Sequence, residues 1–202
     1  MDDAIIIVSG LPRSGTSLMM QMLAAGGVEV VTDHVRTADT DNPRGYYEFE
    51  RVKKIKQDAS WLPEARGKAV KMVSQLLYDL PAGEKYRIIF LERDLDEVLV
   101  SQEKMLERLG RTAAPREAMK QSFLVHLERL KDWLRRRPNV EVLRVGYHDL
   151  LERPAEEAKR LGEFLGGTVD VERMAGAVDP SLYRNRKSPG AGGGLLVAGG
   201  SA

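Results

Sequence analysis

The segment from Gly10 to Ser17 has the residue types and spacing of an anion-binding loop. Its sequence, Gly-Leu-Pro-Arg-Ser-Gly-Thr-Ser, carries two glycines and ends in hydroxyl side chains. Glycines let backbone N–H groups converge on an anion, and the N-terminus of a following helix adds unpaired donors and a favourable dipole. We therefore expect this loop to hold a phosphate-like group.

The loop differs from an ATP- or GTP-binding loop in the position of its cation. The lysine that reaches the β- and γ-phosphates in such loops is replaced by Thr16, and the cation of this segment is Arg13, inside the turn. A kinase would need that lysine and an acidic strand end for Mg²⁺, for which Glu92 is the candidate. The substitution favours an anion shorter than a nucleoside triphosphate.

A second candidate for anion binding begins at Arg93. A cation at the end of an expected strand is followed eight residues later by the hydroxyl of Ser101, in a helix that Asp94 or Asp96 can cap. Arg93 and Ser101 together could hold a second phosphate, the first by charge and the second by a hydrogen bond.

The two motifs resemble those of the sulfotransferases that use 3′-phosphoadenosine 5′-phosphosulfate (PAPS). Gly-Leu-Pro-Arg-Ser-Gly-Thr-Ser is similar to the family's 5′-phosphosulfate loop, closest to the form in tyrosylprotein sulfotransferases and bacterial relatives. The spacing of Arg93 and Ser101 is similar to the 3′-phosphate motif. The resemblance implies a P-loop fold, PAPS as co-substrate and adenosine 3′,5′-bisphosphate (PAP) as product.

The resemblance also implies roles for the residues of the first loop. Arg13 would neutralise the charge that builds on the bridging oxygen as the S–O bond breaks. The residues that would bind the 5′ phosphate and the sulfate are Pro12, Arg13, Ser14, Gly15, Thr16 and Ser17.

Two C-terminal segments resemble the family less closely. Tyr147-His-Asp-Leu is similar to a Tyr-Glu-Asp-Leu segment, which would place Tyr147 near the adenine, although a buried tyrosine after a strand also fits core packing. Arg186 and Lys187 are similar to an Arg-Lys-Gly loop that closes over the 3′ phosphate, with Ser188 in place of the glycine. A basic run before a glycine-rich tail is also typical of a solvated surface.

Sulfuryl transfer needs a base that removes the proton of the acceptor, and three residues are candidates. Comparison with tyrosylprotein sulfotransferases puts the counterpart of their catalytic glutamate at His34, and a histidine has a suitable unperturbed pKa of about 6.5. Asp33 is the neighbouring substitute. Glu48, beside two tyrosines in Asn-Pro-Arg-Gly-Tyr-Tyr-Glu, is the third candidate.

The composition excludes several kinds of site. The chain of 202 residues contains 31 Lys and Arg against 30 Asp and Glu, so its net charge gives no reason to expect nucleic-acid or membrane binding. It has no cysteine, and its three histidines show no metal-ligand spacing, so we expect no metal. No signal peptide or membrane span is expected, and the cytoplasm is the default location.

Alternating strands and helices predict an α/β fold, a three-layer sandwich with a mainly parallel sheet, similar to P-loop NTPases. The loop and Arg93 follow strands, and ligands of such sheets bind beyond the carboxyl ends of the strands. The expected strands are 4–9, 28–31, 69–73, 86–91 and 140–145, and the expected helices are 16–25, 49–56, one after 93 with Val98, Met105 and Leu109 on one face, 115–137 and 154–165. One domain over 1–187 and a flexible Gly-rich tail over 188–202 are expected.

These patterns favour an enzyme that transfers the sulfuryl group of PAPS to a hydroxyl or amine. A P-loop kinase and a noncatalytic nucleotide-binding module remain as alternatives. The acceptor stays open between a small alcohol, a carbohydrate and a peptide tyrosine, since the segments 32–68 and 175–190 that would select it carry no readable pattern. The oligomeric state is equally open.

Overall fold

The computed structural model describes residues 3–33, 35 and 45–179 of the chain. Its centre is a parallel sheet of four strands in the order β2-β1-β3-β4. The strands are β1 (Ile5–Gly10), β2 (Ala69–Val73), β3 (Tyr86–Glu92) and β4 (Val140–Gly146). β1 is buried along its whole length, as its β-branched run predicts for a strand that is covered on both faces.

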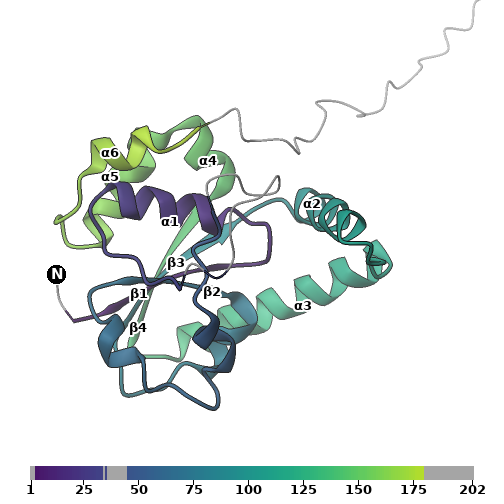
Figure 1. Ribbon diagram of the computed structural model, residues 1–202, viewed down its shortest axis with the longest axis horizontal. Helices are drawn as coiled ribbons and strands as arrows, with labels where there is room; N and C mark the ends of the chain where they lie inside the picture. The colour runs from purple at the N-terminus through teal and green to yellow at the C-terminus, as the bar shows by residue number, and fades with distance from the viewer. Residues whose placement is uncertain (1–2, 34, 36–44, 180–202) are drawn as a thin grey trace, which may run out of the picture.

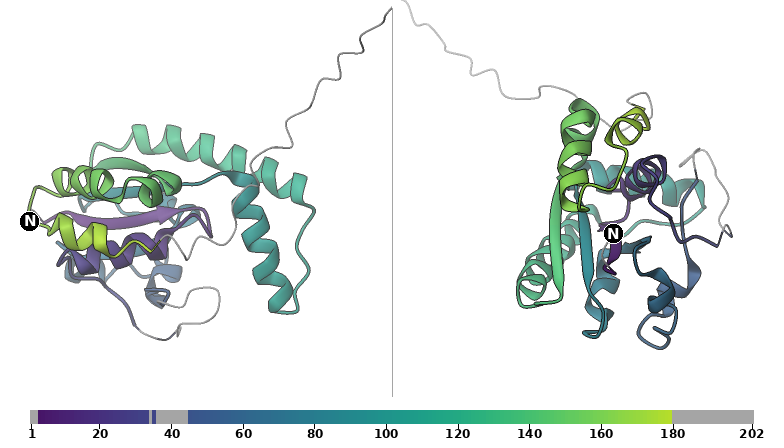
Figure 2. Two further views of the ribbon diagram at one scale, coloured as in Figure 1. Left: turned by 90° about the horizontal axis from the view of Figure 1, so that it is seen from above. Right: turned by 90° about the vertical axis from the view of Figure 1, so that its left-hand side faces the viewer.

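Helices cover both faces of this sheet (Figures 1 and 2). In Figure 1, α1, α5 and α6 lie above the sheet, whereas α3 and the short 3₁₀ helices lie below it. The helices are α1 (Thr16–Ala25), α2 (Leu95–Arg108), α3 (Arg116–Arg135), α4 (Tyr147–Glu152), α5 (Pro154–Phe164) and α6 (Val171–Gly176), with 3₁₀ helices η1 (Glu50–Lys54), η2 (Leu62–Ala65) and η3 (Ser74–Asp79). The predicted three-layer α/β architecture is confirmed.

The two cores that cover the faces of the sheet follow the alternation of side chains along the strands. Ile5 and Ile7 of β1 pack with α3 and the 3₁₀ helices, in a core that includes the fully buried Trp61. Ile6 and Val8 point to the opposite face and pack with α1, α5 and α6. The sheet is thereby fixed between two apolar layers, and its carboxyl edge becomes a rigid platform.

The carboxyl ends of three neighbouring strands meet at the place where the motifs begin. Gly10, the last residue of β1, is in register with Val73 of β2 on one side and with Leu91 of β3 on the other. The anion loop, the end of β2 and Arg93 therefore start from adjacent positions at one edge of the sheet.

Two predicted elements and one predicted helix face differ from the structure. Residues 28–31 form a single bridge, Val30 with Ala69, instead of a strand. Asp33 N donates to Glu48 O directly afterwards, so the chain leaves the sheet before a ladder can form. The helix expected over 49–56 is the shorter 3₁₀ helix η1, and Leu109 lies beyond the end of α2 with 58% of its surface exposed.

Candidate functional site

The predicted anion loop connects β1 to the N-terminus of α1. Gly15 precedes the helix with φ of 105°, and a Cβ atom at this position would overlap the ring of Tyr147. Met19 N donates to Gly15 O in the first bond of the helix, and no side chain among the described residues caps the N-terminus of α1. A helix N-terminus without a side-chain cap, at the positive end of the helix dipole, is an arrangement that binds an anion.

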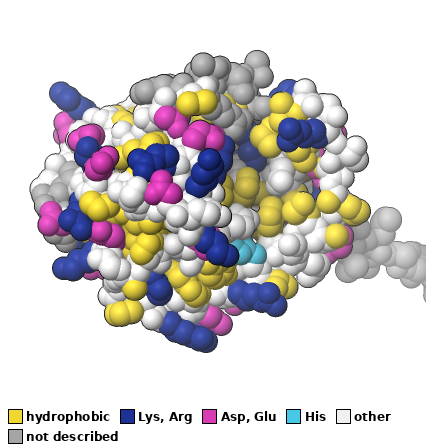
Figure 3. Space-filling view, turned by 60° about the horizontal axis from the view of Figure 1, so that its bottom comes forward, with side chains coloured by type: hydrophobic (Ala, Val, Ile, Leu, Met, Phe, Trp, Pro, Cys, Tyr) yellow, Lys and Arg dark blue, Asp and Glu magenta, His cyan; other side chains and the backbone are white. Residues whose placement is uncertain are grey.

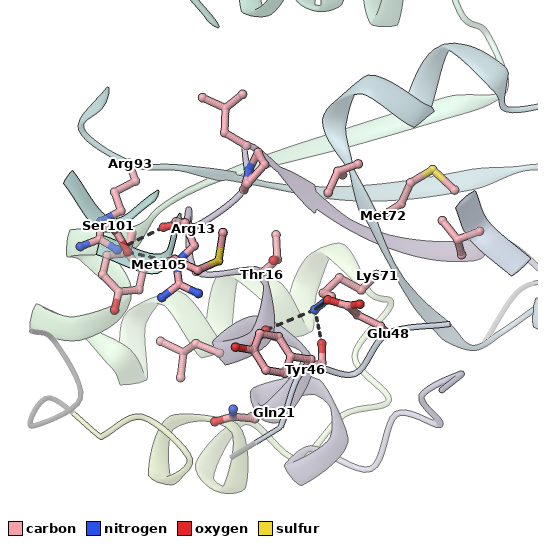
Figure 4. Close-up of a pocket in the computed structure, with 18 of the residues that line it drawn as sticks. Arg13, Thr16, Gln21, Tyr46, Glu48, Lys71, Met72, Arg93, Ser101 and Met105 are labelled. Carbon is pink, nitrogen blue, oxygen red and sulfur yellow. Dashed lines mark hydrogen bonds and ion pairs between the residues drawn. The ribbon is translucent and has the colours of Figure 1, made fainter. Parts of the chain in front are cut away.

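Arg13 joins the loop to the second predicted motif. Its backbone has φ of 71°, in the left-handed region that a residue other than glycine seldom adopts. Arg13 Nε donates to Ser101 Oγ at 3.0 Å, and Arg93 Nη1 donates to Arg13 O at 3.1 Å (Figure 4). The structure therefore brings together the two motifs that the sequence places more than 70 residues apart.

Arg93 is held by buried partners on α2 and α4. Its Nε donates to Glu97 Oε2 at 2.9 Å, and only 7% and 3% of the two side chains are exposed. The guanidinium lies 4.4 Å from the ring centre of Tyr147, and His148 Nε2 lies 3.4 Å from Glu97 Oε1. Asp94 caps α2 by accepting from the backbone N–H groups of the two acidic residues that follow Leu95. Arg93 is consequently fixed in direction before any ligand binds.

Tyr147 lies between the two anion-binding motifs. Its ring packs against Gly15 on one side and against Arg93 on the other, and only 9% of the residue is exposed. Burial raises the pKa of its hydroxyl. Tyr147 also lines the cavity described below, so it can contact a ligand as well as support the loop.

Lys71 is a site residue that the sequence analysis missed. It comes from β2, with 12% of its side chain exposed, and its Nζ donates to Ser17 Oγ at 3.3 Å and to the carbonyl of Tyr46. Glu48 Oε1 lies 3.8 Å from the same Nζ (Figure 4). The loop without its own lysine therefore receives an ammonium group from the neighbouring strand. Alternation along β2 was the available signal, because Lys71 falls on the same face as the buried Ala69.

The three candidate bases have different surroundings. Glu48 lines the cavity, and its carboxylate lies between Lys71 and Lys53, whose Nζ is 4.0 Å from Oε2. Asp33 accepts from Val35 N at 3.0 Å and from Glu50 N at 2.5 Å, and the Glu50 hydrogen bond lowers the pKa of its carboxyl group. Asp33 is not among the residues that line the cavity. His34 lies outside the described residues, as do Arg186 and Lys187.

A cavity of about 520 Å³ opens over the loop and contains most of the predicted residues. The predicted residues that line it are Pro12, Arg13, Gly15, Thr16, Ser17, Glu48, Arg93, Ser101 and Tyr147. Ser14 is the loop residue that does not: it is buried, its Oγ has no hydrogen-bond partner among the described residues, and it lines a separate space of about 220 Å³ behind the loop. The cavity thus gathers the two candidate anion-binding motifs, the ammonium of Lys71 and the carboxylate of Glu48.

Charged side chains also occur outside the cavity. Side chains of both signs are interspersed over the face in Figure 3.

Within the part of the chain that the structure describes, no group of three or more acidic or histidine side chains is arranged to hold a metal ion. Over the same residues, none of the helices has both the length and the apolar character of a membrane span.

Comparison with known proteins gives one family match and several structural neighbours. The model of the family described as "Sulfotransferase domain" matches residues 2–190. The sulfotransferase domain from the curacin biosynthetic pathway superposes with a TM-score of 0.52 at 18% identity, covering 89% of this chain and 88% of that one. This likeness supports the fold. No curated protein is similar enough in sequence to count as a match.

Two further solved structures were found at lower similarity. A sulfotransferase from Alicyclobacillus acidocaldarius has a TM-score of 0.49 at 15% identity, covering 94% of this chain and 88% of that one. The mouse sulfotransferase SULT7A1, complexed with PAP, has a TM-score of 0.48 at 15% identity, covering 88% of this chain and 63% of that one.

Proposed function

This chain belongs to the sulfotransferase domain family, and on that premise we propose that it transfers the sulfuryl group of PAPS to a hydroxyl group of an acceptor, releasing PAP. The observation that carries the proposal is the junction of the two anion sites. Arg13 contacts Ser101 through its side chain and Arg93 through its carbonyl, inside one cavity. A donor with two separated phosphate groups fits such a paired site better than a donor with one linear polyphosphate chain.

The 5′-phosphosulfate of the donor would occupy the loop at the N-terminus of α1. The backbone N–H groups there, which no described side chain caps, and the hydroxyls of Thr16 and Ser17 are the donors available to its oxygens. Lys71, 3.3 Å from Ser17 Oγ, supplies the positive charge on the β2 side of the loop. Such a fixed cation stabilises charge that develops on the sulfuryl and bridging oxygens during transfer.

Glu48 is the residue that we assign as the base. Its carboxylate lines the cavity beside Lys71, the cation assigned to the sulfuryl group, so an acceptor hydroxyl that approaches the sulfur would pass close to it. The acceptor oxygen forms a bond to sulfur while its proton moves to Glu48, and the S–O bond to the 5′ phosphate breaks with its electron pair staying on PAP. Asp33 fits this role less well because two backbone N–H groups already occupy its carboxylate.

The wall of the cavity beside Glu48 favours an acceptor with an apolar body. This wall is formed by the end of β2, η1 and η3, and its apolar residues are Phe49, Val52, Met72, Val73 and Leu76. Val73 exposes 42% of its surface, so it can contact a ligand directly. A carbohydrate would need several polar partners on this wall, whereas a phenol or an aliphatic alcohol would bury apolar surface against it.

The alternative of a kinase finds less support in the surroundings of the loop. Glu92, the acidic strand end that would bind Mg²⁺, is paired with Arg144 at 2.6 Å and lines the separate space behind the loop. A kinase would hold Mg²⁺ against the same phosphates that the loop binds. The anion sites alone would also fit a noncatalytic nucleotide-binding module. A measurement of sulfuryl transfer distinguishes such a module from an enzyme.

The test is calorimetric titration of the purified chain with PAP and with ATP–Mg²⁺, followed by incubation with labelled PAPS and a panel of acceptors. We expect PAP to bind at least tenfold more tightly than ATP–Mg²⁺, which corresponds to about 1.4 kcal/mol. We expect label to pass to phenols and aliphatic alcohols before sugars. Binding of ATP–Mg²⁺ without PAP would exclude the proposal, and tight PAP binding without transfer to any acceptor would favour the noncatalytic module.

A further inference from the structure

Four residues of α2 line the cavity along a single helical face. They are Ser101, Lys104, Met105 and Arg108, at relative positions of zero, three, four and seven. Residues at these intervals share one side of an α-helix. Lys104 therefore projects from the same side as Ser101, the hydroxyl assigned to the second phosphate, and lies one turn further along α2.

The charge around Ser101 is smaller than the number of arginines suggests. A phosphate monoester carries about −1.5 to −2 charges near pH 7. Arg93, which would face it, is already paired at 2.9 Å with Glu97, and that carboxylate is 97% buried. A buried ion pair has little net charge, so Arg93 would orient the phosphate and donate hydrogen bonds to it but would add little net positive charge.

Arg13 is the other cation at this position, and it also belongs to the first loop. Its Nε donates to Ser101 Oγ, while its backbone lies in the turn that would hold the phosphosulfate. Lys71 supplies a second cation to the first loop but lies on its β2 side, so a phosphate held by Ser101 would face only the guanidinium that Arg13 shares with the loop. The site therefore needs a further cation on the Ser101 side.

We propose that Lys104 is that cation, and that it is a specificity-determining residue for the 3′ phosphate of the donor. This inference rests on the proposed function. Side chains one helical turn apart have Cβ atoms about 5–6 Å from each other, and the four-carbon stem of a lysine spans that distance. Lys104 is solvent-exposed and part of the cavity wall, so its ammonium group can move onto a phosphate held by Ser101.

Equilibrium binding of two nucleotides that differ only in the 3′ phosphate tests this role directly. PAP and adenosine 5′-monophosphate (AMP) are titrated calorimetrically into the wild-type chain, Lys104→Gln and Lys104→Arg. The matched control is Arg111→Gln, which removes an exposed cation that follows α2 and does not line the cavity. Circular dichroism checks that each variant remains folded.

We expect Lys104→Gln to weaken PAP binding about tenfold and AMP binding less than twofold, since a charge-assisted hydrogen bond contributes about 1.5 kcal/mol. Lys104→Arg should retain most of the preference for PAP, and Arg111→Gln should change neither affinity. Equal weakening of PAP and AMP would overturn the assignment, because it would indicate that Lys104 raises the electrostatic potential of the whole cavity and does not contact the 3′ phosphate. Unchanged PAP affinity would also overturn it, and would leave Lys104 facing the acceptor.

Failure of this inference differs from failure of the proposed function. If wild-type protein prefers PAP to AMP and Lys104→Gln retains that preference, only the role of Lys104 is wrong. If wild-type protein binds PAP no better than AMP, there is no 3′-phosphate site in this cavity, and both proposals are wrong.

Discussion

Arg93 and Glu97 form an ion pair that is almost completely shielded from water, with Nε and Oε2 at 2.9 Å. The two residues are one turn apart, so the end of β3 and the first turn of α2 fix each other. Arg93 also donates to the carbonyl of Arg13, and this contact extends the pair to the anion loop. Glu97 is thereby a positioning residue for the cation that we propose to face the 3′ phosphate.

Glu97→Ala should be strongly destabilising because it leaves Arg93 buried without its carboxylate. Loss of one partner of a buried ion pair costs about 3–5 kcal/mol. Urea unfolding should report a decrease of this size in the free energy of unfolding, together with weaker PAP binding. Glu103→Ala is the control on the same helix: its carboxylate pairs with Arg116, whose side chain is 51% exposed, and an exposed pair contributes less than about 1 kcal/mol. Equal losses in the two variants would contradict the positioning role.

Glu48→Gln should lower kcat and leave donor binding intact. General bases contribute about 10²-fold to 10⁴-fold to turnover, and glutamine keeps the shape of the side chain but cannot take the proton. Sulfuryl transfer from labelled PAPS measures kcat, and titration with PAP measures the affinity. Asp33→Asn is the comparison variant, for which we expect a smaller loss of kcat. A larger loss in Asp33→Asn would transfer the role of base to that carboxylate.

Gly15→Ala should prevent PAP binding through its effect on the loop. The added Cβ would overlap the ring of Tyr147, and φ of 105° is unfavourable for any residue with a side chain. Gly27→Ala separates the two causes, since Gly27 has φ of 87° and open space around its Cβ position. We expect Gly27→Ala to cost about 1–2 kcal/mol in unfolding free energy without loss of PAP affinity. PAP titration of both variants checks this, and normal binding by Gly15→Ala would remove the steric argument.

His126 should make the stability of the protein depend on pH. Its Nε2 lies 2.9 Å from the Oγ of the fully buried Ser74, and burial lowers the pKa of the imidazole. The folded state therefore binds the proton less readily than the unfolded chain, so stability is complete above the unfolded pKa of about 6.5 and is lost as pH falls from there toward the lowered folded value. Urea unfolding at several pH values measures this loss. His126→Gln should reduce the slope, and an unchanged slope would assign it to other groups.

The strands and the anion loop could be predicted because their signals are local. The β-branched run of β1 and the glycines on either side of Arg13 lie within one short segment, and the observed bounds of α1 agree with the predicted range of 16–25. The segment 28–31 has the same kind of apolar run but forms only one bridge, since its pairing depends on where residue 69 lies. The strand propensity of a segment can be judged from its own residues, whereas its pairing in a sheet depends on the position of a distant strand.

The partners within the site could not be predicted for the same reason. Lys71 acts on the loop because β2 pairs with β1, and the strand order 2-1-3-4 is a property of the whole sheet. Glu97 reads in the sequence as an ordinary acidic residue in the first turn of a helix, although its side chain is buried against Arg93. The sequence shows the two motifs but not the contacts between them, which come from the tertiary structure.

The spacing of the three adjacent strands β2, β1 and β3 limits the distance between the side chains that can contact a ligand. Parallel strands are about 4.8 Å apart, so the end of β2 and the end of β3 are separated by about 10 Å across Gly10. Lys71, level with Val8, and Arg93, two residues beyond Leu91, are attached on the two sides of this interval. Backbone hydrogen bonds, which substitution of side chains leaves in place, therefore set the length of the molecule that can reach both groups. A variant selected for another donor would need to change the side chains that these strands carry, because the spacing of the strands is fixed by the backbone.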